Sequence, residues 1–366
     1  MHIAVDGNEA NVAEQVGVSV YAYNLLRYFQ KQATAEIQFT VFLRKPPLDF
    51  LPAPIRYFQY RVVSGPFLWS AVFLPLELYR LRRFDCFFSP AHYSPKFCPA
   101  PLIVTIHDLS YFYFPDEFLK KDLYKLKNWT AASVKKAAKI IAVSKNTKKD
   151  IVKFYAVPDE TIEVVYNGYE KTAVTTAAVK IQTTLLPSRK YILYVGTLQP
   201  RKNLAILLTT FAKFQRLHSD YQLVIAGKKG WLYDQIFQKV NDLGIANSVV
   251  FPGYVSDEEL IYLYRRAFCS VMPSLYEGFG IPILEAMSYG CPVISSFSSS
   301  LSEIGGEASL YFDPQDEEDL LEKLAELKSN PALAKDLVTK GKARVKLFSW
   351  EKCARETLEI IKSIGK

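Results

Sequence analysis

Residues 269–287 have the sequence CSVMPSLYEGFGIPILEAM. The first four are typical of a short buried strand, and the residues from Ile281 onward have the character of a helix. Gly278 and Gly280 lie between the strand and the helix and let the backbone approach a ligand closely. Pro282 suits the first position of a helix, where its missing N–H costs nothing. The stretch therefore predicts a strand, a turn and a helix that begins with free amide groups.

Amide groups at a helix start, together with the positive end of the helix dipole, form a seat for a diphosphate. Glu277 lies on the predicted turn and Glu285 about two helical turns further on. A carboxylate beside phosphates is suited to hydroxyl groups, so we predict that Glu277 contacts a sugar and Glu285 a ribose. The alternative is an ordinary glycine turn that caps a core helix.

A second turn of this kind has the sequence GTLQPRKNL, residues 196–204. It follows the apolar residues 191–195 and precedes a helical pattern that begins at Leu204. Arg201 and Lys202 are fixed cations that can neutralise charge on a departing nucleotide diphosphate. A basic pair on the surface is the alternative.

Short apolar runs alternate with longer, helix-like segments along the whole chain. This alternation predicts an α/β fold of doubly wound parallel sheets that are covered by helices on both faces. No repeat of fixed period is visible. The predicted strands are residues 3–5, 39–43, 86–88, 102–106, 140–143, 191–195, 222–226, 249–251, 269–272 and 292–295.

The length of 366 residues favours two domains. Residues 170–189 are rich in Thr and Ala and end in LPSRK, which is typical of a connection. We predict an N-terminal domain at 1–169, a linker at 170–189 and a C-terminal domain at 190–349. The two should face each other across a cleft, with ligands at the carboxyl ends of the strands.

The composition, with 49% hydrophobic and 22% charged residues, is that of a globular protein. Five scattered cysteines without C-x-x-C spacing argue against disulfides and zinc, and the N-terminus lacks a signal-peptide pattern, so we expect a cytoplasmic protein. The longest apolar run, residues 65–76, contains two prolines and is too short to cross a bilayer.

The net charge is +8, and much of the excess is a run of lysines in one part of the chain. Solvated helix faces and contact with an anionic membrane both explain it. No nucleic-acid-binding motif accompanies the charge, so we expect no nucleic-acid partner. The lysines are Lys120, Lys121, Lys125, Lys127, Lys135, Lys136, Lys139, Lys145, Lys148, Lys149 and Lys153.

Several motifs of other enzyme classes are missing from the sequence. It has no D-x-D pair to hold a metal on a diphosphate, no P-loop, no nucleophile elbow and no zinc-protease motif. Gly17 also lacks the partner glycines of a dinucleotide fingerprint. We therefore expect no metal and no cofactor, with the cations supplied by the protein.

Taken together, the motifs resemble glycosyltransferase family 4, retaining enzymes of the GT-B fold with two Rossmann-like domains. The resemblance spans nearly the whole chain. The motifs that carry it are VTIHDL at 104–109, AVS at 142–144, VYNG at 165–168, the turn at 196–204, GYV at 253–255, the E-x7-E pattern from Glu277 to Glu285, and FSWE at 348–351.

The resemblance implies roles for individual residues of this chain. Arg201 and Lys202 would bind the donor diphosphate, Glu277 the donor sugar and Glu285 the ribose. His107 would face the transferred sugar. The positions implied to contact the donor are Gly17, Gly196, Thr197, Gly253, Tyr254, Val255, Gly278, Phe279, Gly280 and Ile281, with residues 253–255 beside the base. A final helix from Trp350 to residue 366 would pack back on the N-terminal domain.

Two positions depart from the family pattern. Thr197 stands where many relatives have an arginine, so the phosphate clamp would depend more on Arg201. Gly17 stands alone where relatives often carry two glycines. His107 also has independent support, because it ends an apolar strand with Asp108 beside it. His92 follows another predicted strand and is a weaker candidate for the acceptor side.

The predicted function is retaining transfer of a hexose from a nucleotide sugar to a glycan or lipid-linked acceptor, in surface polysaccharide or glycolipid synthesis. The form of the 196–204 turn is similar to that of GDP-mannose-dependent members, which favours mannose, with a UDP-sugar as the alternative. A sugar-nucleotide epimerase and a silent nucleotide-sugar-binding scaffold are further alternatives. A lipid-linked acceptor would place the enzyme at the inner face of the membrane.

Overall fold

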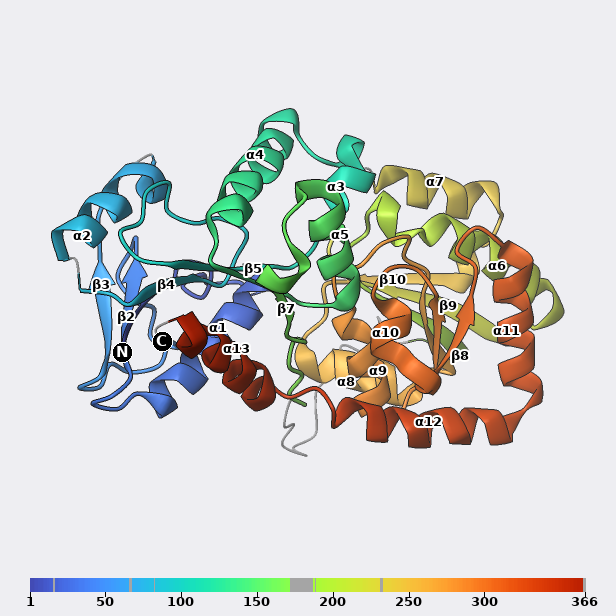
Figure 1. The fold of residues 1–366 in the computed structure, drawn as a ribbon. Helices are drawn as coiled ribbons and strands as arrows, with labels where there is room; N and C mark the ends of the chain where they lie inside the picture. Colours follow the sequence, from blue (N-terminus) through green and yellow to red (C-terminus); the bar gives the residue numbers. More distant parts are fainter. Residues whose placement is uncertain are drawn as a thin grey trace. The chain divides into compact units, whose positions relative to one another are not determined.

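The computed structural model describes residues 1–15, 17–65, 68–81, 83–171, 187, 189–230 and 233–364. The chain divides into two compact units (Figure 1). Unit 1 comprises Met1–Gly168 and Phe348–Lys366, and unit 2 comprises Tyr169–Leu347. Each unit is a Rossmann-like domain with one parallel sheet, so the predicted fold class is confirmed.

Unit 1 contains a seven-stranded sheet in the order β3-β2-β1-β4-β5-β6-β7. The strands are β1 (His2–Asp6), β2 (Gln38–Leu43), β3 (Phe58–Val62), β4 (Cys86–Ser89), β5 (Leu102–Ile106), β6 (Lys139–Ala142) and β7 (Ile162–Val164). The helices are α1 (Val18–Gln32), the π-helix η1 (Trp69–Phe73), α2 (Leu74–Leu81), α3 (Ser110–Tyr113), α4 (Lys120–Lys136), α5 (Lys145–Tyr155) and α13 (Trp350–Ile364). Short 3-10 turns follow α3 and α5.

Side chains of one strand alternate between the two faces of this sheet, because the side-chain period of a strand is two. Ile3 and Val5 of β1 pack in the cluster formed with α1 and α13, whereas Ala4 packs on the opposite side with α2 and α4. Both faces are thus covered, which explains why these strands are apolar throughout.

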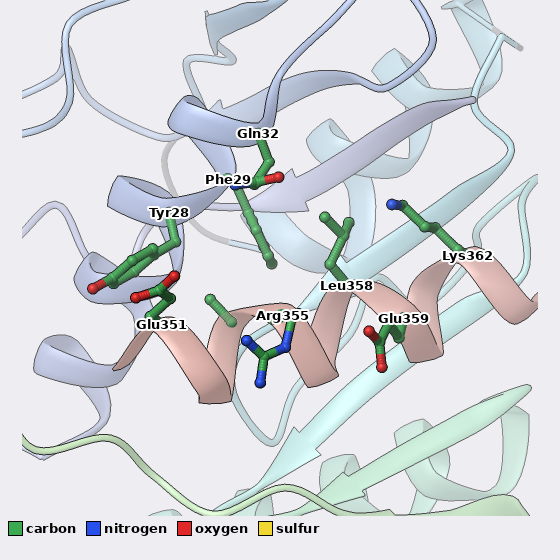
Figure 2. A pocket seen from close by; sticks show the side chains of 9 residues that line it. Tyr28, Phe29, Gln32, Glu351, Arg355, Leu358, Glu359 and Lys362 are labelled. Atoms are coloured by element: carbon green, nitrogen blue, oxygen red, sulfur yellow. The ribbon is translucent and has the colours of Figure 1, made fainter. Parts of the chain in front are cut away.

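The C-terminal helix α13 completes one face of unit 1. Figure 2 shows Phe29 of α1 and Leu358 of α13 extending toward each other, and both are buried. Trp350, at the start of α13, lies against Gly168, where a Cβ would come within 2.2 Å of the Trp350 nitrogen. The two segments of unit 1 therefore share one core.

Unit 2 contains a six-stranded sheet in the order β10-β9-β8-β11-β12-β13. The strands are β8 (Lys190–Val195), β9 (Tyr221–Ala226), β10 (Val249–Gly253), β11 (Cys269–Met272), β12 (Val293–Ser296) and β13 (Ser309–Phe312). The helices are the 3-10 turn η5 (Pro200–Lys202), α6 (Leu204–Leu217), α7 (Asp234–Asp242), α8 (Asp257–Arg266), α9 (Ile281–Ser288), α10 (Leu301–Gly305), α11 (Glu317–Ser329) and α12 (Pro331–Val345).

Every strand that the sequence predicts is present, with ends that differ by one or two residues. The sequence prediction lacks β3, β7 and β13. The connection predicted at 170–189 lies for the most part outside the described residues. Within the described residues, no helix has both the length and the apolar character that a membrane crossing requires.

Candidate functional site

The strand order of unit 2 reverses between β8 and β11. From β8 the chain winds outward through β9 and β10, and from β11 it winds the other way through β12 and β13. In sheets of this kind, ligands bind outside the carboxyl ends of the strands at such a reversal. The turn that contains Arg201 follows β8, and the turn that contains Glu277 follows β11.

These two turns are in direct contact. The backbone N–H of Leu275 donates to the carbonyl of Arg201 at 2.8 Å, and Nη1 of Arg201 donates to the carbonyl of Tyr276 at 3.1 Å. Nζ of Lys202 lies 2.5 Å from Oε1 of Glu277, and Nη1 of Arg201 lies 3.6 Å from Oε2 of Glu277. The two stretches that the sequence singled out therefore form one site within unit 2.

Burial and charge oppose each other at Glu277, whose side chain is almost inaccessible. Burial by itself would raise the pKa of this carboxyl. The attraction of Lys202 and Arg201, together with hydrogen bonds from Lys202 and Ser274, outweighs burial and holds the pKa below its usual value. The site thus keeps two cations and one carboxylate, a net positive charge that an anionic ligand can neutralise.

Helix α9 begins beside this charged group. Its N-cap is Gly280, with φ of 107°, where a Cβ would come within 2.9 Å of Cδ2 of Leu301. The helix begins at Ile281, so Pro282 occupies its second position rather than the predicted first. Because the first N–H groups of a helix have no partner within it, this end of α9 adds partial positive charge to the site.

A set of serines that the sequence prediction missed holds the turn in place. Oγ of Ser300 donates to the carbonyls of Glu277 and Phe279, both at 2.9 Å. The N–H of Glu277 donates to Oγ of Ser299 at 2.8 Å. The run of five serines among residues 295–300, directly after a predicted strand, is the signal that could have found them.

Glu285 lies on α9 and is partly buried. The hydroxyl of Tyr264 donates to its Oε2 at 3.0 Å. Burial raises the pKa of Glu285 to about 7, and the charge of Asp257 acts in the same direction. Near neutral pH this carboxyl exchanges its proton readily, and a ligand hydroxyl that donates to it would favour the ionised form.

The loops after β9 and β10 are tied to the loop after β8. A Cβ on Gly227 would come within 2.0 Å of the Gly196 oxygen, so glycine is required there. Leu198 and Gly230 extend the contact, since Leu198 donates to the Lys228 carbonyl and accepts from Gly230. Sequence reasoning missed this GKKG segment, although its glycines directly follow a predicted strand.

The predicted base-side segment, Gly253 to Val255, lies next to this segment. Gly227 donates to the Gly253 carbonyl at 2.8 Å, and Nζ of Lys228 lies 4.7 Å from the centre of the Tyr254 ring. The Tyr254 side chain is 69% exposed and offers a flat aromatic face. Gly196 and Thr197 lie at the same edge, with Tyr194 donating to the Thr197 carbonyl.

In unit 1, His107 follows β5 and is buried. Its Nε2 donates to the Pro90 carbonyl at 2.8 Å, and its backbone N–H donates to Nε2 of His92 at 3.3 Å. Burial, followed by the neighbouring His92, lowers the pKa of His107 to about 4. The imidazole is therefore neutral at physiological pH.

Gly17 is the N-cap of α1, in the same unit, with φ of 47°. A Cβ at this position would meet no atom within 4 Å, so the glycine borders open space. Tyr21, one turn further along α1, packs edge-on against His107 with ring centres 4.8 Å apart. The two predicted residues of unit 1 are thus linked through Tyr21.

Comparison with known proteins supports the relationship that the motifs indicate. Residues 16–172 match the family model of Glycosyltransferase Family 4, and residues 178–344 match that of Glycosyl transferases group 1. O-antigen chain mannosyltransferase B of Escherichia coli is 32% identical over 265 residues, which are 71% of this chain and 70% of that protein. The chain belongs to glycosyltransferase family 4.

A second relative is O-antigen chain mannosyltransferase RfbU of Salmonella typhimurium. It is 35% identical over 215 residues, or 58% of this chain and 57% of that protein. The two family models and the similarity to O-antigen chain mannosyltransferase B agree, so the chain is a glycosyltransferase.

Solved structures place this family 4 enzyme in the GT-B fold. Sucrose-phosphate synthase from Thermosynechococcus elongatus superposes with a TM-score of 0.76 at 20% identity, covering 99% of this chain and 98% of that one. Anabaena HepE in complex with UDP-glucose gives 0.76 at 16% identity, covering 99% and 100%. WaaG, a glycosyltransferase of lipopolysaccharide biosynthesis, gives 0.71 at 14% identity, covering 99% of both chains.

Proposed function

We propose that this enzyme transfers mannose from GDP-mannose to a glycan or lipid-linked acceptor in surface polysaccharide or glycolipid synthesis. The observation that carries the proposal is the contact of Arg201 and Lys202 with Glu277 beside the start of α9. Cations, a helix N-terminus and a carboxylate in one place fit a ligand that has both phosphates and sugar hydroxyls.

We assign the diphosphate of the donor to Arg201, Lys202 and the first turn of α9. Both side chains are largely buried, at 18% and 12% exposure, so a phosphate that reaches them meets cations with little competing water. Glu277 keeps the two cations aligned before the donor arrives and has its second role with the sugar hydroxyls. Because the cations are fixed in advance, they cost little reorganisation during the reaction.

The proposed reaction proceeds with retention of anomeric configuration. The acceptor hydroxyl approaches the anomeric carbon on the face from which the diphosphate leaves. The bond between that carbon and the phosphate oxygen breaks, the bond to the acceptor oxygen forms, and the acceptor proton passes to the departing phosphate oxygen. No strong protein base is needed, which is compatible with a neutral His107. His107 and Gly17 are assigned to the sugar and acceptor side by the family resemblance alone.

The donor preference for mannose has two supports. The GTLQPRKNL form of the 196–204 turn is similar to that of GDP-mannose-dependent enzymes, and the two relatives described above are named mannosyltransferases. A UDP-sugar is the second candidate, since HepE was solved with UDP-glucose. Calorimetric titration of the pure protein with GDP and with UDP separates them, and clearly tighter UDP binding would overturn the mannose assignment.

Product analysis tests the reaction itself. We expect release of GDP from GDP-mannose only when a suitable acceptor is present, an α-linked product by NMR, and full activity in EDTA. Conversion of the donor without any acceptor would instead identify an epimerase or a hydrolase. Nucleotide binding without turnover across a panel of acceptors would identify a binding scaffold.

A further inference from the structure

Unit 1 has a cavity of about 320 Å³, and its described lining residues differ from those assigned above. It opens between η1, the segment after β4 and the second half of α4. Most of its lining is apolar. The lining residues are Leu68, Ser70, Ala71, Tyr93, Ser94, Pro95, Lys96, Trp129, Ala132, Ser133 and Lys136.

The walls of this cavity are tied together by hydrogen bonds. The N–H of Lys96 donates to the Ser70 carbonyl at 3.1 Å, which joins the segment after β4 to η1. The N–H of Ser94 donates to Oγ of Ser133 at 3.0 Å, which joins the same segment to α4. The cavity is therefore a fixed feature of the surface rather than a gap between independent loops.

Three large apolar side chains project into solvent around the cavity. Leu68 is 61% exposed, Phe97 is 56% exposed and Trp129 is 41% exposed. Leu68 also has a left-handed backbone, with φ of 65°, which a branched side chain adopts at a cost. Exposure of three such side chains around one cavity is unusual for a surface that faces only water.

Each aromatic ring of this group has a lysine over it. Nζ of Lys125 lies 5.7 Å from the Trp129 ring centre, and Nζ of Lys96 and Lys136 lie 5.6 and 5.7 Å from that of Phe97. Helix α4 carries six lysines against one aspartate, Asp122. Leu68, Phe97, Trp129, Lys96, Lys125 and Lys136 are called the docking face below.

We propose that the docking face binds the surface of an anionic phospholipid bilayer. Exposed Leu, Phe and Trp insert at the boundary between headgroups and acyl chains, and lysines beside them pair with anionic headgroups. The cavity gives room for one headgroup or chain end among the rings. A neutral glycan carries no charge to pair with the three lysines. A protein partner is not favoured, because lysine is depleted in protein–protein interfaces.

Co-sedimentation with vesicles tests the proposal without using any donor. The protein should bind vesicles of phosphatidylcholine with phosphatidylglycerol, bind pure phosphatidylcholine much more weakly, and dissociate as salt increases. The double variant Lys96→Gln/Lys136→Gln should bind about 25-fold more weakly, because each lysine near an anionic surface contributes about fivefold. Leu68→Asn/Phe97→Ser should also bind more weakly, and its residual binding should be more salt-sensitive.

Matched changes in unit 2 serve as controls. Lys335→Gln/Lys346→Gln removes the same charge from exposed positions of α12 and its end, and Leu217→Ser removes an apolar side chain that is 74% exposed. Both should bind vesicles like the unchanged protein. Thermal unfolding and GDP titration verify that each variant is folded.

Equal binding to both kinds of vesicle, or equal losses in the docking-face and control variants, would overturn the proposal. Binding of a neutral oligosaccharide that Trp129→Ala abolishes, with no binding to vesicles, would replace the membrane with a glycan. Since no donor is present, a failure of the proposed sugar transfer would leave the vesicle result unaffected.

Discussion

In each unit, the carboxyl ends of the strands and the loops that follow them form one edge of the sheet, called the unit 1 edge and the unit 2 edge. The two edges have the same topology, but burial leaves a charged carboxylate at the unit 2 edge and neutral groups at the unit 1 edge. In each unit the strand order reverses beside the first strand, between β1 and β4 in unit 1 and between β8 and β11 in unit 2. Burial acts on the ionisable groups at both edges. At the unit 2 edge, Lys202 and Arg201 keep Glu277 ionised despite its burial.

At the unit 1 edge, the partners that oppose burial do not outweigh it. Burial lowers the pKa of His107 to about 4 and raises that of Asp6, at the end of β1, to about 6, although Asn8 donates to the Asp6 carboxyl. Both groups are pushed toward their neutral forms. The fold thus sets where a ligand can bind, and the residues on the loops decide whether it is charged.

The largest expected effect is that of removing a cation from the unit 2 edge. Lys202→Ala should lower the transfer rate about a hundredfold, or about 3 kcal/mol of transition-state stabilisation, because charge on the leaving diphosphate loses a fixed partner. Steady-state kinetics measure this. Lys213→Ala, which breaks ion pairs with Glu317 and Glu318 on another surface, is the control and should leave the rate within about twofold. Full turnover by Lys202→Ala would refute the assignment.

At the unit 1 edge, the prediction concerns stability rather than rate. The folded pKa of His107 is below the unfolded value, so the unfolded state binds a proton first as pH falls. Stability should decrease between about pH 6.5 and pH 4, by at most about 3 kcal/mol. His107→Gln, which can still donate to the Pro90 carbonyl, should lose this part of the decrease. Urea unfolding over a pH series measures it.

His218→Gln is the control for that series, because it changes a histidine of unit 2. It should keep the decrease below pH 6.5. An identical pH dependence in His107→Gln and the unchanged protein would show that the pKa of this imidazole does not change on folding, and the contrast between the two edges would fail.

Glu285 provides a smaller, graded effect at the unit 2 edge. If ribose hydroxyls donate to its carboxylate, nucleotide affinity follows the ionised fraction of a group with a pKa of about 7. GDP should then bind about tenfold more tightly at about pH 8 than at about pH 6, and Glu285→Gln should flatten this dependence. The phosphates titrate equally in both proteins, so the difference between their pH profiles isolates Glu285. Parallel profiles would remove it from the ribose site.

The smallest expected effect is at Tyr254. Tyr254→Leu keeps an apolar side chain but loses the flat ring beside Lys228, so GDP affinity should decrease about threefold. Tyr124→Leu, at a ring of similar exposure on α4, is the control and should bind GDP normally. A loss larger than that of Lys202→Ala in the same titration would mean that the base, not the diphosphate, anchors the donor.

The sequence predicted the fold class and the two turns of the unit 2 edge because both depend on local patterns. Apolar runs predicted ten of the strands, and glycines next to Arg201, Lys202 and Glu277 predicted the turns. It missed β3, whose residues FQYRV alternate in polarity at a sheet edge, and the three-residue β7. Short or half-exposed strands are formed by pairing with neighbours, which a local pattern does not contain.

Contacts between residues far apart in the sequence could not be predicted either, because a local pattern does not contain the distant partner. Ser300 is 23 residues from Glu277, yet its hydroxyl is bonded to the Glu277 carbonyl, and Gly227 is placed by the Gly196 backbone. The serine run and the GKKG segment mark these positions in the sequence, but neither pattern names the distant partner. The raised pKa of Glu285 likewise follows from burial and from the charge of Asp257, which becomes a neighbour only after folding.

The return of α13 to unit 1 has a consequence for how the protein is made. Unit 2 is one continuous segment, whereas unit 1 lacks Trp350, Leu358 and Ile361, all buried in its core, until the last helix has been synthesised. A chain that leaves the ribosome in order can therefore complete its second unit before its first. The nascent unit 1 exposes one apolar face throughout that interval, and chaperone capture should be strongest there.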